Sequence, residues 1–174
     1  MPEHPPEKRH PRLFTADATK HATAANGLYA ELHCRSNFSF LSAASHPDEL
    51  ISRASELGLA ALAITDRNSV AGVVRAHIAA KDLGLKLLIG AEIAPVDSPT
   101  IVLWSINRTG YGRLCRLITR GRRNAPKGEC NLTLSDVLEH SDGLLAGLQL
   151  KESGASVSSS ANQLREAFGD RTYL

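Results

Sequence analysis

The chain has 174 residues, of which 43% are hydrophobic and 22% are charged, as in an ordinary globular domain with its own core. Its net charge of +2 is too small to indicate a nucleic-acid partner, and no apolar run approaches the ~18–20 residues of a membrane span. The three cysteines form no paired motif and no apolar leader is present, which predicts a reduced protein of the cytoplasm.

Residues 1–27 show no apolar period and are predicted to form a disordered tail. Beyond them, short apolar or alternating runs predict strands, and apolar residues recurring every three or four positions predict helices. In chain order we expect a strand in 28–34, a helix in 45–59, a strand in 60–65, a helix in 69–85, strands in 86–95 and 100–106, helices in 110–123 and 133–140, a strand in 143–150, a helix in 160–168 and a strand in 171–174.

This alternation of strands and helices predicts an α/β fold with parallel strands, either as an open sheet or as a barrel. The sequence ends as a strand is starting, after about six strands, whereas a closed α/β barrel usually needs ~200 residues or more. We therefore expect residues 28–174 to be the N-terminal piece of something longer, with the barrel not closed.

Polar side chains stand at the ends of three successive predicted strands. His33, Asp66 and Glu92 each follow or end an apolar run. The carboxyl ends of parallel strands converge, and imidazole and carboxylate together suit zinc, manganese or iron. Each residue also has a structural explanation, because Asp66 could cap the next helix, Glu92 could be solvated and His33 could be hydrogen-bonded. The pattern alone leaves both interpretations open.

Three segments carry a family resemblance. The segments YAELHCRSNFSF, LAALAITDRNSVAGVVRAHIAAKDLGLKLLIGAEI and GYGRLCRLITRGRR together resemble the PHP (polymerase and histidinol phosphatase) domain at the N-terminus of bacterial C-family DNA polymerases, in particular the error-prone, polymerase III alpha-type branch. The resemblance runs from about Leu28 to Leu174. It implies a distorted (β/α)7 barrel, here incomplete, that precedes the palm, thumb and fingers of the polymerase.

The resemblance also implies a site for zinc or manganese. The family pattern is H-x-H on the first strand, an acid in the following loop, T-D-H on the second strand and G-x-E on the third. His33 and Glu92 match ligand positions, whereas Arg35 and Arg67 replace histidines and the loop acid falls at or near Ser42. Arginine cannot donate a lone pair to a metal, and a catalytic zinc usually takes three protein ligands. We predict a degenerate site with no functional metal cluster and no cofactor.

The two substitutions predict a set of ion pairs instead. Arg35 and Arg67 would take the place of the cations and pair with Asp66 and Glu92 across the strand ends. Guanidinium groups suit carboxylates well, and clustered carboxylates without a counter-charge are costly when partly buried.

The helix in 110–123 carries a row of arginines opposite an apolar face. These are Arg113, Arg116, Arg120 and Arg123. The usual explanation is a solvated helix face, and the alternative is a surface that contacts phosphate groups or docks to the polymerase domains.

The sequence is compatible with three functions. The favoured one is a non-catalytic PHP module of an error-prone DNA polymerase, acting in replication or translesion repair synthesis. It would contact the remaining polymerase domains or replication proteins, and DNA only indirectly, with no membrane contact. The alternatives are a metal-dependent phosphoesterase or 3′–5′ exonuclease of the PHP family, and a free-standing regulatory or remnant protein.

Overall fold

The computed structural model describes residues 29–150 and 155–173, so the tail expected at 1–27 lies outside the described residues. The helices and strands follow one another as expected. They are β1 (Ala30–Cys34), α1 (Pro47–Glu56), β2 (Ala61–Ile64), α2 (Val73–Leu83), β3 (Lys86–Ile93), β4 (Ile101–Ser105), α3 (Arg108–Arg123), α4 (Leu134–Glu139), β5 (Leu144–Leu148), α5 (Ala155–Phe168), a 3-10 turn (Gly169–Arg171) and β6 (Thr172–Tyr173).

Local signals explain where the first two helices begin and end. Pro47 occupies the first position of α1, where a missing N–H costs nothing. The N–H of His46 donates to the carboxylate of Glu49 (2.8 Å), which caps this end of the helix. α2 ends at Gly84, whose φ of +68° is left-handed backbone that glycine adopts without strain.

The six strands form one sheet in the order β1-β2-β3-β4-β5-β6, which confirms the α/β class. The pairs β1–β2, β2–β3 and β5–β6 are parallel, so the sheet is mostly parallel. The expectation of parallel strands throughout is wrong at β4, which runs antiparallel to both β3 and β5. Residues 94–100 link β3 to β4, and such a link is too short for the crossover of a dozen or more residues that a parallel pair needs.

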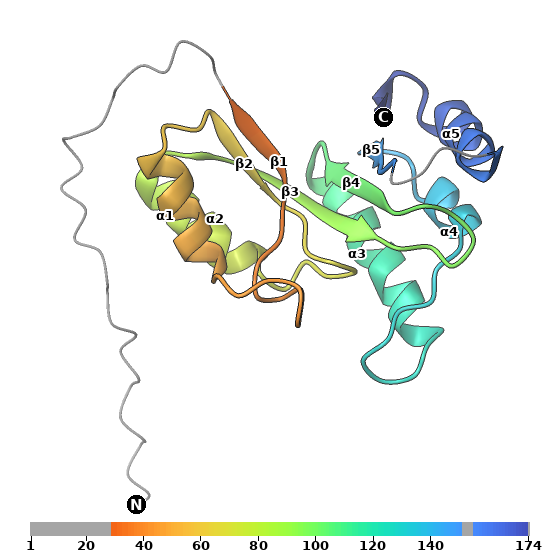
Figure 1. The fold of residues 1–174 in the computed structure, drawn as a ribbon, viewed down its shortest axis with the longest axis horizontal. Helices are drawn as coiled ribbons and strands as arrows, with labels where there is room; N and C mark the ends of the chain where they lie inside the picture. Colours follow the sequence, from red (N-terminus) through yellow and green to blue (C-terminus); the bar gives the residue numbers. More distant parts are fainter. Residues whose placement is uncertain (1–28, 151–154, 174) are drawn as a thin grey trace, which may run out of the picture.

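The sheet is curled into a half-barrel, which brings strands far apart in its order close together (Figure 1). Nε1 of Trp104 in β4 donates to the carbonyl oxygen of Leu32 in β1 (2.8 Å). Gln149, directly after β5, lies 2.9 Å from Nδ1 of His33 in β1. In a flat sheet with strands ~4.8 Å apart, β1 and β5 would stand about 19 Å from each other.

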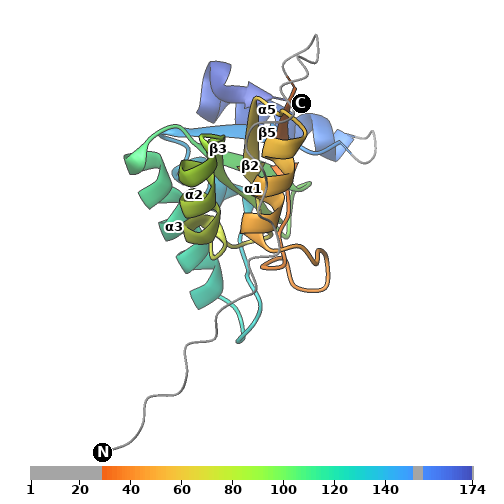
Figure 2. The ribbon, with the colours of Figure 1, turned by 90° about the vertical axis from the view of Figure 1, so that its left-hand side faces the viewer.

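Helices cover the sheet in two groups, each with its own core. α1 and α2 pack side by side against β2 (Figure 2), around Ile51, Leu62 and Ala76. α3, α4 and α5 enclose a larger core against β4 and β5, with Leu117 and Phe168 among its buried members. No helix in residues 29–150 or 155–173 has the length and apolar character of a membrane span.

Candidate functional site

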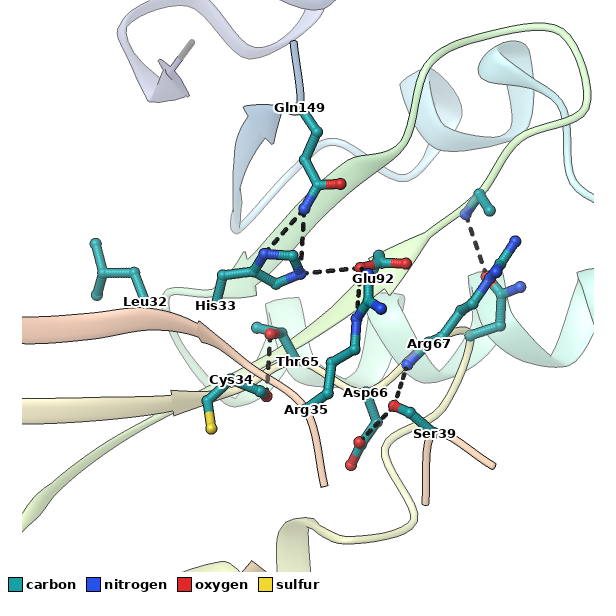
Figure 3. Close-up of polar contacts among 12 residues, drawn as sticks. Leu32, His33, Cys34, Arg35, Ser39, Thr65, Asp66, Arg67, Glu92 and Gln149 are labelled. Atoms are coloured by element: carbon teal, nitrogen blue, oxygen red, sulfur yellow. Dashed lines mark hydrogen bonds and ion pairs between the residues drawn. The ribbon is translucent and has the colours of Figure 1, made fainter. Parts of the chain in front are cut away.

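The ends of β1, β2 and β3 bring together four of the residues singled out in the sequence (Figure 3). His33 lies on β1 and Arg35 directly after it, Asp66 follows β2, and Glu92 lies near the end of β3. They meet because β1, β2 and β3 are parallel neighbours, so that their carboxyl ends lie at one edge of the sheet.

Glu92 is the centre of this group and is only 2% exposed. Its Oε2 accepts hydrogen bonds from Nε of Arg35 (2.9 Å) and from Nη2 of the same side chain, and lies 2.9 Å from Nε2 of His33. Burial by itself would raise the pKa of Glu92. The hydrogen bonds from His33 and Arg35 and the charge of Arg35 outweigh burial and hold that pKa below its ordinary value. Glu92 is therefore an ionised carboxylate with a built-in counter-charge.

His33 connects Glu92 to the far side of the curled sheet. Nε2 of Gln149 lies 2.9 Å from Nδ1 of His33. The same amide nitrogen lies 3.2 Å from Nε2 of His33, which also contacts the Glu92 carboxylate. Both ring nitrogens are thus engaged within the protein.

Asp66 has a different role from the one expected. It is fully buried, and its carboxylate accepts from the N–H and the Oγ of Ser36 and from the Oγ of Ser39, each at 2.7 Å. These bonds fasten the loop between β1 and α1 to the end of β2. No arginine among the described residues pairs with Asp66, so its negative charge is held by hydroxyl and amide donors.

Arg67 does not make the expected ion pair. Its backbone is fixed, because its N–H donates to Oγ of Ser39 (3.0 Å) and the residue forms a parallel bridge with Glu92. Its side chain is exposed and points away from Glu92 (Figure 3). Within residues 29–150 and 155–173, no ion pair joins Arg67 to Asp66 or Glu92.

The residues in the ligand positions do not fit a metal ion. Arg35 and His33 already bind the same oxygen of Glu92, and His33 has no free ring nitrogen. The oxygens of Asp66 are occupied by the donors of the loop after β1. In the described part of the chain, no group of three or more His, Cys, Asp or Glu side chains could hold a metal.

Cys34, the last residue of β1, stands between His33 and Arg35 but is not a nucleophile. Burial, followed by the negative charges of Glu31 and Asp66, raises the pKa of its thiol to about 11. Because the thiolate is the reactive form, a thiol with this pKa is inert near neutral pH.

Half of the arginine row on α3 is engaged within the molecule. Arg113 pairs with Asp142 (3.2 Å). Arg120 pairs with two acids of α4, at 2.9 and 2.6 Å. Arg116 and Arg123 are exposed and make no ion pair with the described residues. The four side chains therefore do not form a continuous free basic surface.

Sequence reasoning missed three members of the site. Ser36 and Ser39 gave no signal, because a serine in a loop has no pattern that tells which carboxylate it will reach. Gln149 lies at the end of a run predicted as a strand, but only the curl of the sheet places it beside His33.

Comparison with known proteins places the chain in a family. Residues 31–172 match the PHP domain. An error-prone DNA polymerase of Rhodopirellula baltica is 49% identical over 157 residues, which is 84% of this chain and 14% of that protein. An error-prone DNA polymerase of Methylococcus capsulatus is 54% identical over 119 residues, 68% of this chain and 11% of that protein. The chain thus spans only a small part of the length of these curated relatives.

Solved structures share the fold at low sequence identity. An amidohydrolase from Chromobacterium violaceum has a TM-score of 0.54 at 17% identity, covering 82% of this chain and 74% of its own. A lesion-specific endonuclease from Pyrococcus furiosus has a TM-score of 0.53 at 15% identity, covering 82% of this chain and 40% of its own. These likenesses agree with the curled α/β sheet, and the family match over residues 31–172 shows that the chain belongs to the PHP domain family.

Proposed function

We propose that this chain serves as the PHP module of an error-prone DNA polymerase and contributes structure or contacts to it, not hydrolysis. The observation that carries the proposal is the contact of Arg35 with the buried carboxylate of Glu92. The relatives at about half identity are error-prone DNA polymerases of much greater length. Its partners would be the remaining polymerase domains or replication proteins in the cytoplasm, with DNA contacted indirectly.

The chemistry of the site supports a structural role. Metal-assisted hydrolysis of a phosphate ester needs cations that activate water and hold the phosphate. Here the positive charge next to Glu92 is a guanidinium, which keeps its protons and cannot activate a bound water. The same guanidinium compensates a buried carboxylate and ties β1 to β3, so the site stabilises the end of the sheet without a metal.

Metal titration and nuclease assays of the same preparation test this proposal. Calorimetric titration of the chain with Mn²⁺ or Zn²⁺ is expected to show no stoichiometric binding. Assays for phosphatase and 3′–5′ exonuclease activity with added Mn²⁺ are expected to show no metal-dependent turnover. Stoichiometric metal binding together with metal-dependent hydrolysis would instead establish the phosphoesterase or exonuclease alternative.

A double variant sharpens this test. Arg35→His with Arg67→His restores the histidines of the family pattern, and it is expected to bind Mn²⁺ or Zn²⁺ more tightly than the original chain. The control is Arg116→His with Arg123→His, which introduces two exposed histidines on α3, outside the positions of the family pattern. Equal gains in the two double variants would show that the strand ends are not a former metal site.

A further inference from the structure

β3 has a neighbour on its β2 side along most of its length, but β4 pairs only with its second half. Its first half, Lys86–Ile89, pairs with β2, and its second half, Gly90–Ile93, pairs with β4. The pairing with β4 stops at Gly90 and Trp104, because β4 ends one residue later and the chain turns into α3. Within residues 29–150 and 155–173, the first half of β3 therefore has no strand partner on its β4 side.

The backbone groups that face this open side can be assigned. Glu92 uses both its N–H (3.1 Å) and its C=O (2.7 Å) toward the segment that follows β2. Successive residues of a strand direct these groups to alternate sides, so Leu87 and Ile89 direct theirs to the β4 side. The C=O of Ile89 indeed accepts from Oγ of Ser105 (2.9 Å). The N–H and C=O of Leu87 face the part of the edge that β4 does not reach.

A cavity of about 770 Å³ lies along this edge. Its walls are Lys86–Ile89, Trp104–Arg108 at the end of β4, Val73 and Val74 on α2, and Tyr111 on α3. Its size falls in the range of ~300–1,000 Å³ that binding pockets occupy. It lies where an extension of β4 would run, so its shape and its unpaired backbone groups suit an added strand.

The rim of the cavity is basic. His77, Lys86 and Arg108 are exposed lining residues, and no Asp or Glu lines the cavity in the described part of the chain. Lys86 and Arg108 make no ion pair with the described residues. A ligand with negative charges next to its apolar part would complement this rim.

We propose that this cavity binds an extended peptide that adds a strand to the free edge of β3, with apolar side chains toward Val73 and Val74 and acidic residues against Lys86 and Arg108. Adding a strand satisfies the backbone groups of Leu87, which a helix cannot do because its own backbone groups are already paired. The apolar walls favour a peptide over a nucleic acid. The peptide site does not depend on the Glu92 site, which lies near the opposite end of β3.

Synthetic peptides test the proposal with the full chain. The probes are two labelled peptides of alternating valine and threonine, one with glutamates and one with lysines at both ends, measured by fluorescence anisotropy. The acidic peptide is expected to bind about tenfold more tightly. N-methylation of the alternate residues that face β3 removes main-chain donors and is expected to weaken binding by about tenfold or more. The same modification on the other residues is expected to change it little.

Two matched variants locate the site. Lys86→Glu reverses a charge on the rim and is expected to weaken binding of the acidic peptide by about three- to tenfold. Lys81→Glu changes another exposed lysine, on α2 outside the cavity, and is expected to leave the affinity for the acidic peptide unchanged. Circular dichroism of both variants checks that the fold is intact.

Four outcomes would overturn the proposal. They are equal affinity for the acidic and basic peptides, no effect of N-methylation in either register, tighter binding of a single-stranded oligonucleotide that displaces the peptide, and self-association of the chain that Lys86→Glu abolishes. The third outcome would assign the edge to nucleic acid and the fourth to a second copy of this chain.

Discussion

At the scale of single residues, the state of Glu92 depends on two neighbours. Arg35 supplies the charge and His33 supplies a further donor, and both reach the same carboxylate oxygen. Arg35 is itself about one-third exposed, whereas the Glu92 side chain is 3% exposed. The energetic consequence of losing the charge therefore falls between that of a surface pair and that of a fully buried one.

Replacing Glu92 by glutamine tests whether the loss of this charge costs more than the loss of a surface ion pair. Glu92→Gln keeps the shape but leaves the Arg35 guanidinium without its counter-charge, so we expect the free energy of unfolding to fall by about 1–3 kcal/mol. The measurement is urea unfolding at neutral pH. Glu56→Gln is the control, since it breaks an exposed pair with Arg53 and should cost less than about 0.5 kcal/mol. Equal losses in the two variants would contradict a special role for Glu92.

The same variant has a defined pH dependence. The folded pKa of Glu92 lies below its ordinary value of 4.5, so the ionised group stabilises the fold above that pH and the stabilisation is lost as the pH falls through the folded pKa. The gap in stability between the original chain and Glu92→Gln should therefore be widest near neutral pH and should narrow as the pH falls below 4.5. Asp136, whose pKa is also lowered, is common to both proteins and cancels. If the difference in stability widened as the pH fell, the pKa of Glu92 would not be lowered in the folded protein.

The sequence predicted which residues meet at this site but not all of the contacts that they make. The convergence of His33, Asp66 and Glu92 follows from strand order, because parallel neighbours place their carboxyl ends together. Which partner each side chain selects depends on where a loop or a distant strand runs. Asp66 therefore binds serines instead of an arginine, and Gln149 escaped notice.

At the scale of the elements, periodicity in the sequence identifies β4 as a strand but does not decide whether it runs parallel or antiparallel to its neighbours. Each strand was recognisable from its own residues, but its direction depends on the length of the link before it. The link at residues 94–100 contains no helix, and a link this short by itself favours an antiparallel pair. The reversal has a consequence, because β4 then ends beside the middle of β3 and leaves Lys86–Ile89 with a strand partner among the described residues only on the β2 side.

Replacing either of two glycines in the first turns of α3 by alanine is expected to change the free energy of unfolding in opposite directions. A Cβ on Gly110 would overlap the carbonyl oxygen of Gly143, in the turn before β5, whereas a Cβ on Gly112 meets nothing within 4 Å. Gly110→Ala should lower the free energy of unfolding by about 2–3 kcal/mol, because the helix must move off that turn. Gly112→Ala should raise it by about 0.5–1 kcal/mol through the lower chain entropy of the unfolded state. Urea unfolding of both variants decides this, and changes of the same sign would contradict the close contact.

At the scale of the whole molecule, one sheet carries two separate cores. The core under α1 and α2 is the smaller and includes Ile51, and the core under α3, α4 and α5 is larger and includes Leu117. β3 belongs to both halves, which are also joined by contacts such as those of His33 with Gln149 and of Trp104 with Leu32. Since buried apolar area is the main favourable contribution to folding, we infer that the half with α1 and α2 opens first.

Hydrogen exchange on two core variants tests this order of opening. Leu117→Ala should lower the free energy of global unfolding by about 2–5 kcal/mol. If the half with α1 and α2 opens while the other half stays folded, its opening does not break the contacts of Leu117. Amides of α3 and β5 should then lose protection in Leu117→Ala, while amides of α1 and β2 keep theirs.

Ile51→Ala is the converse variant. Ile51 loses its contacts in both the partial and the global opening, so protection should fall in both halves by similar amounts. A molecule that opens only as one cooperative unit would show uniform loss of protection in both variants. The asymmetry between Leu117→Ala and Ile51→Ala therefore separates the two mechanisms, and it would show that β3 can stay paired with β4 after its pairing with β2 is lost.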